Sequence, residues 1–158
     1  MIEHPRSKKE RIQQMEKIYS VADIATYIIR YCNDKNYAVS NLKLQKILYF
    51  IQAEFLVRKN RPCFKEKVEA WPFGPVVPEV YHSYKGYGGG TVLTQKKPST
   101  AISETDQEII IMMIKECQRY SNVELEEMTK RQTPWKQAYK AGENQVISNE
   151  SIKEFFKD

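Results

Sequence analysis

The stretch of sequence that decides the fold spans residues 40–55 and reads SNLKLQKILYFIQAEF. Its apolar residues recur at intervals of three and four, which is the period of a helix that buries one face. That apolar stripe consists of Leu44, Ile47, Leu48, Ile51 and Phe55. Ser40 or Asn41 can cap the helix, because either side chain accepts a hydrogen bond from a free backbone N–H. We expect a central helix that brings three other side chains partly to the surface, namely Lys43, Lys46 and Tyr49.

Two further helices are predicted from capping boxes, in which a serine and an acidic residue three positions later satisfy free backbone donors. One S-x-x-D box lies at residues 20–23 and the other at residues 103–106, and apolar residues at helical spacing follow each. We expect the first helix to end near Asn33 and the second near Asn122. Shorter helical pieces are predicted over residues 78–85, 125–131, 135–141 and 148–156.

A small amount of β-structure is predicted between these helices. Residues 68–71 alternate apolar and charged side chains, which indicates a short strand. Residues 72–75, Pro-Phe-Gly-Pro, are typical of a turn, and residues 86–90 predict a flexible glycine loop. Residues 91–94 could pair with the strand at 68–71. The expected fold class is α+β and predominantly α-helical, a single compact helical domain with a small two- or three-stranded β ribbon.

The composition is that of one globular domain. The chain has 158 residues, of which 41% are hydrophobic and 28% charged, so it can bury a sizeable core but is too short for two independent ones. Its longest apolar runs are much shorter than the roughly 20 residues that cross a bilayer, and no secretory signal is visible. We divide the chain into an N-terminal extension, residues 1–18, and a domain over residues 19–158.

The cysteines and histidines argue against metal binding and catalysis. Cys32, Cys63 and Cys117 are odd in number and widely spaced, which favours reduced thiols and a cytoplasmic location. His4 and His82 are the only histidines, too few for a zinc site with these cysteines. Cys63 and His82 could act as a nucleophilic pair only if folding joined them, and a free cysteine is more often a small core residue. We expect no enzyme activity, no metal and no cofactor.

The formal net charge of +5 is unevenly distributed along the chain. Residues 1–100 carry 17 Lys and Arg against 9 Asp and Glu, whereas residues 101–158 carry 8 against 11. A basic front half could attract an acidic protein or a nucleic acid. A helix-turn-helix would use Asn41, Lys43, Gln45 and Lys46 as DNA contacts, but its turn would exceed the usual length of about three or four residues. A DNA-binding regulator stays open as an alternative.

Aromatic residues are concentrated around the predicted turn. Trp71, Phe73, Tyr81, Tyr84 and Tyr87 lie within 17 positions of one another. Tyrosine and tryptophan are typical anchors of protein interfaces, although each of these residues could instead belong to the core. The concentration favours a binding module over a catalyst.

Two blocks of the sequence resemble the antitoxin SocA-like, Panacea domain family, which also includes phage-associated proteins. The first is LKLQKILYFIQA at residues 42–53, and the second is EAWPFGPVVPEVY at residues 69–81. Residues 128–139 look like the family's Thr-His segment with the Pro-Trp that follows, except that Lys130 stands where histidine is expected. The resemblance covers residues 19–156 and implies a small cytoplasmic protein that neutralises a cognate toxin by direct binding.

The resemblance also implies partners and a binding face. A cognate toxin protein is the expected partner, and no membrane is expected. One family member delivers its toxin to a protease, so a proteolytic adaptor is an alternative, as is a phage or mobile-element accessory protein. The partner-binding face that we predict, from residues concentrated in the two blocks, consists of Lys46, Tyr49, Trp71, Phe73, Tyr81 and Tyr84. The competing interpretation is that the two blocks form the core of the fold.

Overall fold

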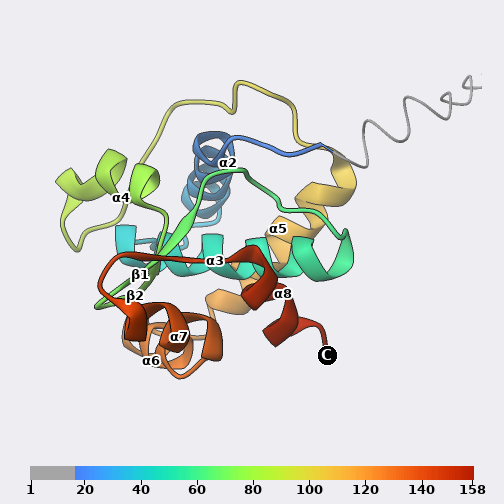
Figure 1. Ribbon diagram of the computed structural model, residues 1–158. Coiled ribbons are helices and arrows are strands. Elements are labelled where there is room, and N and C mark those ends of the chain that lie inside the picture. The colour runs from blue at the N-terminus through green and yellow to red at the C-terminus, as the bar shows by residue number, and fades with distance from the viewer. Residues whose placement is uncertain (1–16) are drawn as a thin grey trace, which may run out of the picture.

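Helix α3, Asn41–Arg58, runs through the centre of the molecule, and most of the other elements pack against it (Figure 1). The computed structural model describes residues 17–158. Ser40 begins α3 by accepting a hydrogen bond from the Lys43 N–H at 3.1 Å. Side chains on almost every side of α3 are buried, rather than one stripe alone. The helix is therefore the pillar of the core.

Each of the other predicted helices is present. They are α2 (Val21–Asp34), α4 (Pro78–Tyr84) with the 3-10 turn η1 (Lys85–Tyr87), α5 (Glu104–Cys117), α6 (Asn122–Lys130), α7 (Thr133–Ala141) and α8 (Asn149–Phe156). The prediction that α5 extends to near Asn122 is wrong, because the helix ends at Cys117. Ser121 and Glu124 form a reciprocal capping box just beyond it, and this box begins α6 as a separate helix.

Three short strands form one antiparallel sheet in the order β2-β1-β3. They are β1 (Val68–Trp71), β2 (Gly74–Val76) and β3 (Gln145–Ile147). A two-residue turn joins β1 to β2, while β3 reaches the other edge of β1 from near the C-terminus. The predicted fold class, α+β and mainly helical with a small ribbon, is confirmed.

The predicted pairing of residues 91–94 with β1 is wrong. Both edges of β1 are occupied by β2 and β3, so no edge is left for a further strand. Residues 91–94 instead lie beside the C-terminal end of α2 and the loop after it. There the Val92 N–H donates to the carbonyl of Val39 in that loop at 2.8 Å. Asn33 Nδ2 donates to the Val92 carbonyl at 3.1 Å, so this segment is held by α2 and the loop after it.

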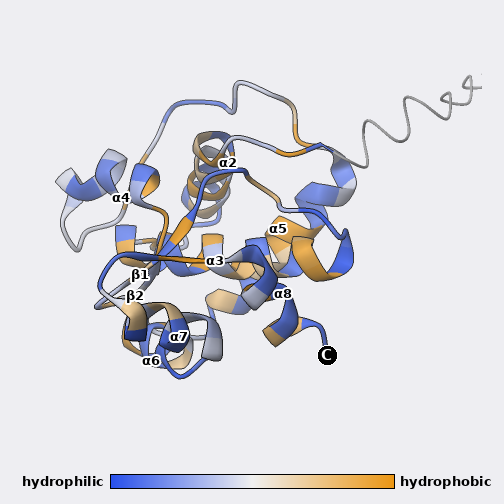
Figure 2. Cartoon of the chain, in the orientation of Figure 1, coloured by the Kyte–Doolittle hydropathy of each residue, from blue (hydrophilic) through white to orange (hydrophobic). Residues whose placement is uncertain are grey.

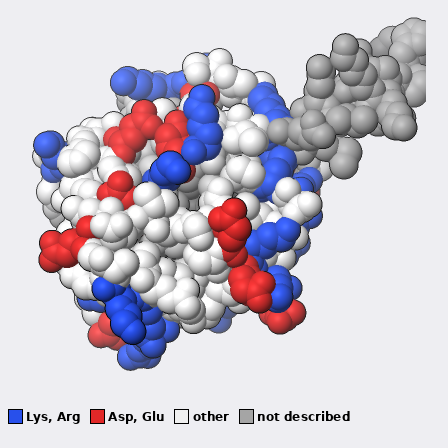
Figure 3. Space-filling model, in the orientation of Figure 1, with Lys and Arg blue, Asp and Glu red and all other residues white. Residues whose placement is uncertain are grey.

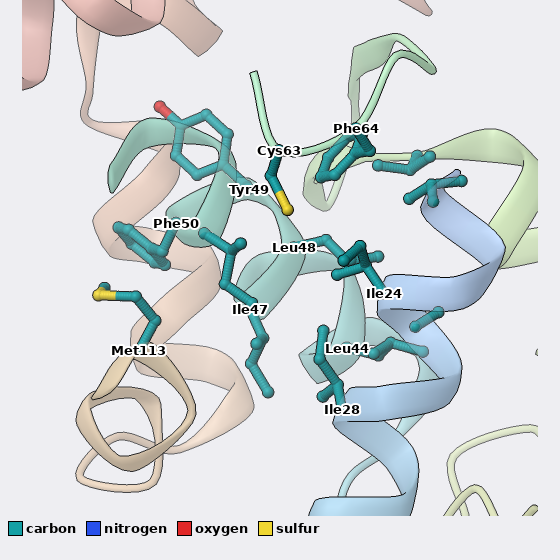
Figure 4. Close-up of a cluster of buried hydrophobic side chains, with 14 of the residues drawn as sticks. Ile24, Ile28, Leu44, Ile47, Leu48, Tyr49, Phe50, Cys63, Phe64 and Met113 are labelled. Carbon is teal, nitrogen blue, oxygen red and sulfur yellow. The ribbon is translucent and has the colours of Figure 1, made fainter. Parts of the chain in front are cut away.

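The hydrophobic core lies between α2, α3 and α5. Ile24 and Ile28 of α2 point toward Leu44 and Leu48 of α3, and Met113 approaches α3 from α5 (Figure 4). Figure 2 shows that hydrophobic residues gather where these helices face one another, whereas α4 is mostly hydrophilic. Helix α4 therefore lies at the edge of the core and carries side chains outward.

A buried ion pair joins α5 to the connection that follows α3. Asp106 is fully buried and accepts two hydrogen bonds from Arg61 Nη2, at 3.0 and 2.8 Å. Tyr19 Oη donates a third to the same carboxylate at 2.7 Å. Such a pair stabilises the fold only while both charges are present, since each has lost its contact with water.

The predicted N-terminal extension, residues 1–18, lies outside the described residues except for Lys17 and Ile18. Lys17 Nζ donates to the Ala101 carbonyl at 2.7 Å. Across residues 17–158, none of the helices has the length and apolar character needed to span a membrane.

Candidate functional site

Amide side chains buried on α3 position the segment that leads from β2 into α4. Gln45 Oε1 accepts a hydrogen bond from the Val77 N–H at 2.9 Å, and Gln45 Nε2 donates to Asn41 Oδ1 at 2.9 Å. Asn41 Nδ2 in turn donates to the Tyr81 carbonyl at 2.9 Å. Because an unpaired buried backbone group is costly, these amides fix α4 relative to α3.

The turn between β1 and β2 is held from two sides. Gly74 has φ +110°, and a Cβ at this position would lie 2.7 Å from Lys46 Cε. The backbone therefore approaches α3 so closely that only glycine, which has no Cβ, fits here without strain. On the other side, Trp135 Nε1 of α7 donates to the Trp71 carbonyl at 2.9 Å. The side chains of Trp71 and Phe73 are therefore carried on fixed backbone.

Four side chains around this turn form a cluster that we call the aromatic face: Trp71, Phe73, Tyr81 and His82. The Trp71 ring is central, with its centroid 5.7 Å from that of Phe73, 5.0 Å from Tyr81 and 6.0 Å from His82. The contacts with Phe73 and Tyr81 have the edge-to-face geometry that aromatic pairs favour. The first three side chains are half-buried and His82 is exposed, so the cluster is open to solvent.

The structure brings together some of the predicted partner-binding residues but not all of them. Trp71, Phe73 and Tyr81 are joined in the aromatic face, and Lys46 Nζ lies 5.8 Å from the centre of the Phe73 ring. Tyr84 lies apart and makes its ring contact with Tyr87, at 6.4 Å. Whether any of these residues contacts a partner stays a prediction.

The expectation that Lys43, Lys46 and Tyr49 lie partly at the surface is wrong. They are 9%, 2% and 0% exposed, respectively. Neighbouring elements also cover the sides of α3 that lie outside the apolar stripe, which the sequence pattern alone would leave facing solvent. Lys43 Nζ donates to the Tyr120 carbonyl at 3.1 Å, and Tyr49 Oη donates to Gln132 Oε1 at 2.7 Å. Burial raises the pKa of Tyr49 above its usual range. Tyr49 is thus a neutral hydrogen-bond donor buried in the core.

Sequence reasoning missed His82 as a member of the aromatic face. Its ring lies 5.5 Å from that of Tyr81, its neighbour on α4, as well as contacting Trp71. Adjacent helix positions usually point in different directions. The short α4 passes so close to the end of β1 that both side chains reach the same tryptophan, and this approach has no signal in the local sequence.

Lys46 has the most unusual environment on α3. Its Nζ has no hydrogen-bond partner among the described residues. The ideal Cβ position of Gly74 lies 3.2 Å from Nζ and 3.1 Å from Thr129 Oγ1, so β2 and α6 enclose the end of the lysine. Burial lowers the pKa of Lys46 to about 7, while the Glu126 carboxylate acts to raise this pKa and the Lys130 ammonium to lower it.

A cavity of about 110 Å³ opens beside Lys46. It is lined by Leu42, Lys46, Phe73, Asn122, Val123 and Glu126. Leu42 and Val123 are 37% and 62% exposed, and Phe73 belongs to the aromatic face as well. The cavity is therefore a mainly apolar recess, with Lys46, Asn122 and Glu126 as its polar lining residues. It continues into the aromatic face through Phe73, which belongs to both.

The catalytic pair considered from sequence is not assembled. Cys63 is fully buried after α3, where burial raises the pKa of its thiol and keeps it protonated. His82 is exposed on α4, in contact with Trp71. Among residues 17–158, no group of three His, Cys, Asp or Glu side chains is placed to hold a metal ion.

The helix-turn-helix interpretation fails on burial. Its four proposed DNA contacts, Asn41, Lys43, Gln45 and Lys46, are all buried in the interior of the fold, so α3 cannot lie in a DNA groove. On the face shown in Figure 3, Lys and Arg side chains are intermixed with Asp and Glu, rather than gathered into one basic patch.

The residues of the aromatic face lie within the part of the chain that matches a known protein family. The model of the antitoxin SocA-like, Panacea domain family matches residues 44–136. Antitoxin SocA of Caulobacter vibrioides (strain NA1000 / CB15N) is 52% identical over 50 residues, which are 32% of this chain and 27% of SocA. The match thus spans about a quarter of that relative's length. No solved structure matches the chain.

Proposed function

Because the chain belongs to the antitoxin SocA-like, Panacea domain family, we propose that it is an antitoxin that neutralises a cognate toxin by binding it directly. It acts in the cytoplasm as a binding protein and not as an enzyme. The observation that carries the proposal is the aromatic face, whose four members all lie in the part of the chain that the family model matches.

The aromatic face has the properties of a binding anchor. Its residue types are those that dominate the energy of protein interfaces when a partner covers them. Its backbone is held by Gly74 against α3 and by the hydrogen bond from Trp135, so little conformational freedom is lost on binding. A rigid aromatic cluster that is already half-exposed supports direct contact with a protein.

The test is co-expression of this chain with the product of the adjacent gene, each alone and together, followed by affinity purification of a tagged copy. We expect the neighbour to arrest growth alone, and the pair to grow and to co-purify. Phe73→Ala with Tyr81→Ala should abolish both rescue and co-purification, provided that circular dichroism and thermal melting show a folded chain. Phe155→Ala is the matched control, because Phe155 is 43% exposed on α8, away from the aromatic face.

The same experiment separates this function from the alternatives. Rescue with loss of the toxin protein from the cell would indicate a proteolytic adaptor instead of occlusion. A harmless neighbour would argue against an antitoxin and favour a phage accessory or regulatory protein. Full rescue by the folded Phe73 and Tyr81 double variant would show that the toxin binds elsewhere.

A further inference from the structure

The buried polar side chains of α3 are matched to partners with one exception. Gln45 binds the Val77 N–H just before α4, and Asn41 binds the Tyr81 carbonyl within α4. Lys43 binds the Tyr120 carbonyl, and Tyr49 binds Gln132. Gln52 accepts from the Cys63 N–H at 2.8 Å and donates to the Phe64 carbonyl at 3.0 Å. Only the Lys46 ammonium, 2% exposed, is left without a hydrogen-bond partner among the described residues.

The end of the Lys46 side chain is closely surrounded by other residues. The Gly74 backbone lies so close that an added Cβ would be 2.7 Å from Lys46 Cε, and the Phe73 ring centre lies 5.8 Å from Nζ. An ammonium group has three hydrogen-bond donors, and a buried one that lacks acceptors is costly. The nearest open space is the cavity of about 110 Å³ that the Lys46 side chain helps to line, which is room for a carboxylate group or for three to four waters at roughly 30 Å³ each. Nζ itself is buried behind this lining, so an ion pair there requires a small movement of the end of the side chain toward the cavity.

We propose that this cavity receives the carboxylate of an acidic side chain of the partner protein, which forms an ion pair with Lys46. The inference rests on the proposed function and adds the chemistry of the group that the toxin inserts. Leu42 and Val123 at the exposed edges would contact apolar atoms beside that acid. Phe73 connects the cavity to the aromatic face, so one partner surface can cover both.

Two charged residues of α6 face Lys46. Lys130 adds positive charge that favours an incoming anion, whereas Glu126 lines the cavity and opposes it. Among residues 17–158, no carboxylate lies within ion-pair distance of Lys46. Glu126 is half-exposed, so its charge is screened by water more than that of a group inserted beside Lys46.

The first experiment uses the full chain with 13C-labelled lysine and needs no toxin. NMR follows the titration of Lys46, identified by the signal lost in Lys46→Met, in sodium acetate, sodium phosphate and sodium chloride at equal ionic strength. A bound carboxylate favours the charged lysine, so acetate should raise the Lys46 pKa relative to chloride and leave exposed Lys115 unchanged. Equal titration in acetate and chloride, an equal shift at Lys115, or a shift in phosphate alone overturns the proposal.

Glu126→Gln provides a second variant that leaves Lys46 in place, and it keeps the proposal testable if Lys46→Met does not fold. Removing the opposing charge should at least double the affinity for acetate measured from the same titration. Unchanged or weaker acetate binding in folded Glu126→Gln contradicts an anion held in this cavity.

The second experiment measures toxin binding in the co-expressed complex. Lys46→Met should weaken it by at least about thirtyfold, the loss typical of truncating one partner of a buried charge pair, whereas Lys115→Met should bind like wild type. If wild type fails to neutralise while acetate still shifts Lys46, the antitoxin function is wrong and the carboxylate site stands. If wild type and folded Lys46→Met bind the toxin equally, the carboxylate inference is wrong and the antitoxin function stands.

Discussion

Asp106→Asn is the substitution whose energetic cost the structure defines most directly. The carboxylate is fully buried and accepts two hydrogen bonds from Arg61 and one from Tyr19, at 2.7 to 3.0 Å. Lys59 Nζ lies 3.9 Å from the same group. Asparagine offers one acceptor oxygen and removes the negative charge that compensates the buried Arg61. Removing one partner of such a pair costs about 3–5 kcal/mol, a large part of the roughly 5–15 kcal/mol by which native proteins are stable.

Urea unfolding of the wild type and the variant, followed by circular dichroism, measures this loss. The matched control is Glu116→Gln, which breaks the pair between Arg119 Nη1 and Glu116 Oε1 at 3.1 Å. These side chains are 68% and 46% exposed, so we expect the control to change the free energy of unfolding by less than about 1 kcal/mol. The two substitutions remove the same kind of charge and differ in burial.

A double variant tests whether the cost comes from the broken pair. Arg61→Met combined with Asp106→Asn removes both charges, so the pair of substitutions should cost less than the sum of the two single ones. An Asp106→Asn variant as stable as Glu116→Gln, or strictly additive losses in the double variant, would refute the reasoning.

Three further predictions concern the region around α3. Lys46→Met should stabilise the protein most at pH 7 and below. Burial lowers the pKa of Lys46 in the folded protein to about 7, so the unfolded chain binds this proton more tightly than the folded one does. The difference in unfolding free energy between variant and wild type, measured by urea unfolding, should therefore shrink as the pH rises from 7 to 10. Gly74→Ala should cost about 1–3 kcal/mol in thermal melting, because its φ is +110° and its Cβ would lie 2.7 Å from Lys46 Cε, whereas Gly86→Ala meets nothing within 4 Å. Tyr49→Phe should cost about 1–3 kcal/mol, measured by urea unfolding, because it leaves the buried Gln132 amide oxygen without its donor.

The helices could be predicted from the sequence because their signals are local. The capping serines Ser20, Ser40 and Ser103 each accept a hydrogen bond from the backbone N–H three residues later, as their patterns indicate. The stripe on α3 is buried as its spacing predicts. The composition of residues 72–75 predicts a turn, and the structure has it at Pro72 and Phe73, with Gly74 and Pro75 already in β2. Gly74 adopts the positive φ for which glycine is suited.

The candidate site could be predicted only in part. The concentration of Trp71, Phe73 and Tyr81 around the turn is visible in the sequence, and the structure joins them in one cluster. The pairing of β1 with β3 was missed because the two strands are far apart in the chain, and short strands carry little signal of their own. His82 was missed for the same reason, since only the packing of α4 against the end of β1 brings it to Trp71.

The sequence by itself determined which segments are helical, where they are capped and where the aromatic turn lies, since these depend on residues within one or two turns of each other. Only the tertiary structure decided that α3 is covered on nearly all sides, by β2, α6 and α8 as well as by α2 and α5. That covering removes Lys46 from water, and it follows from which distant surfaces meet α3 and not from the spacing of residues along it.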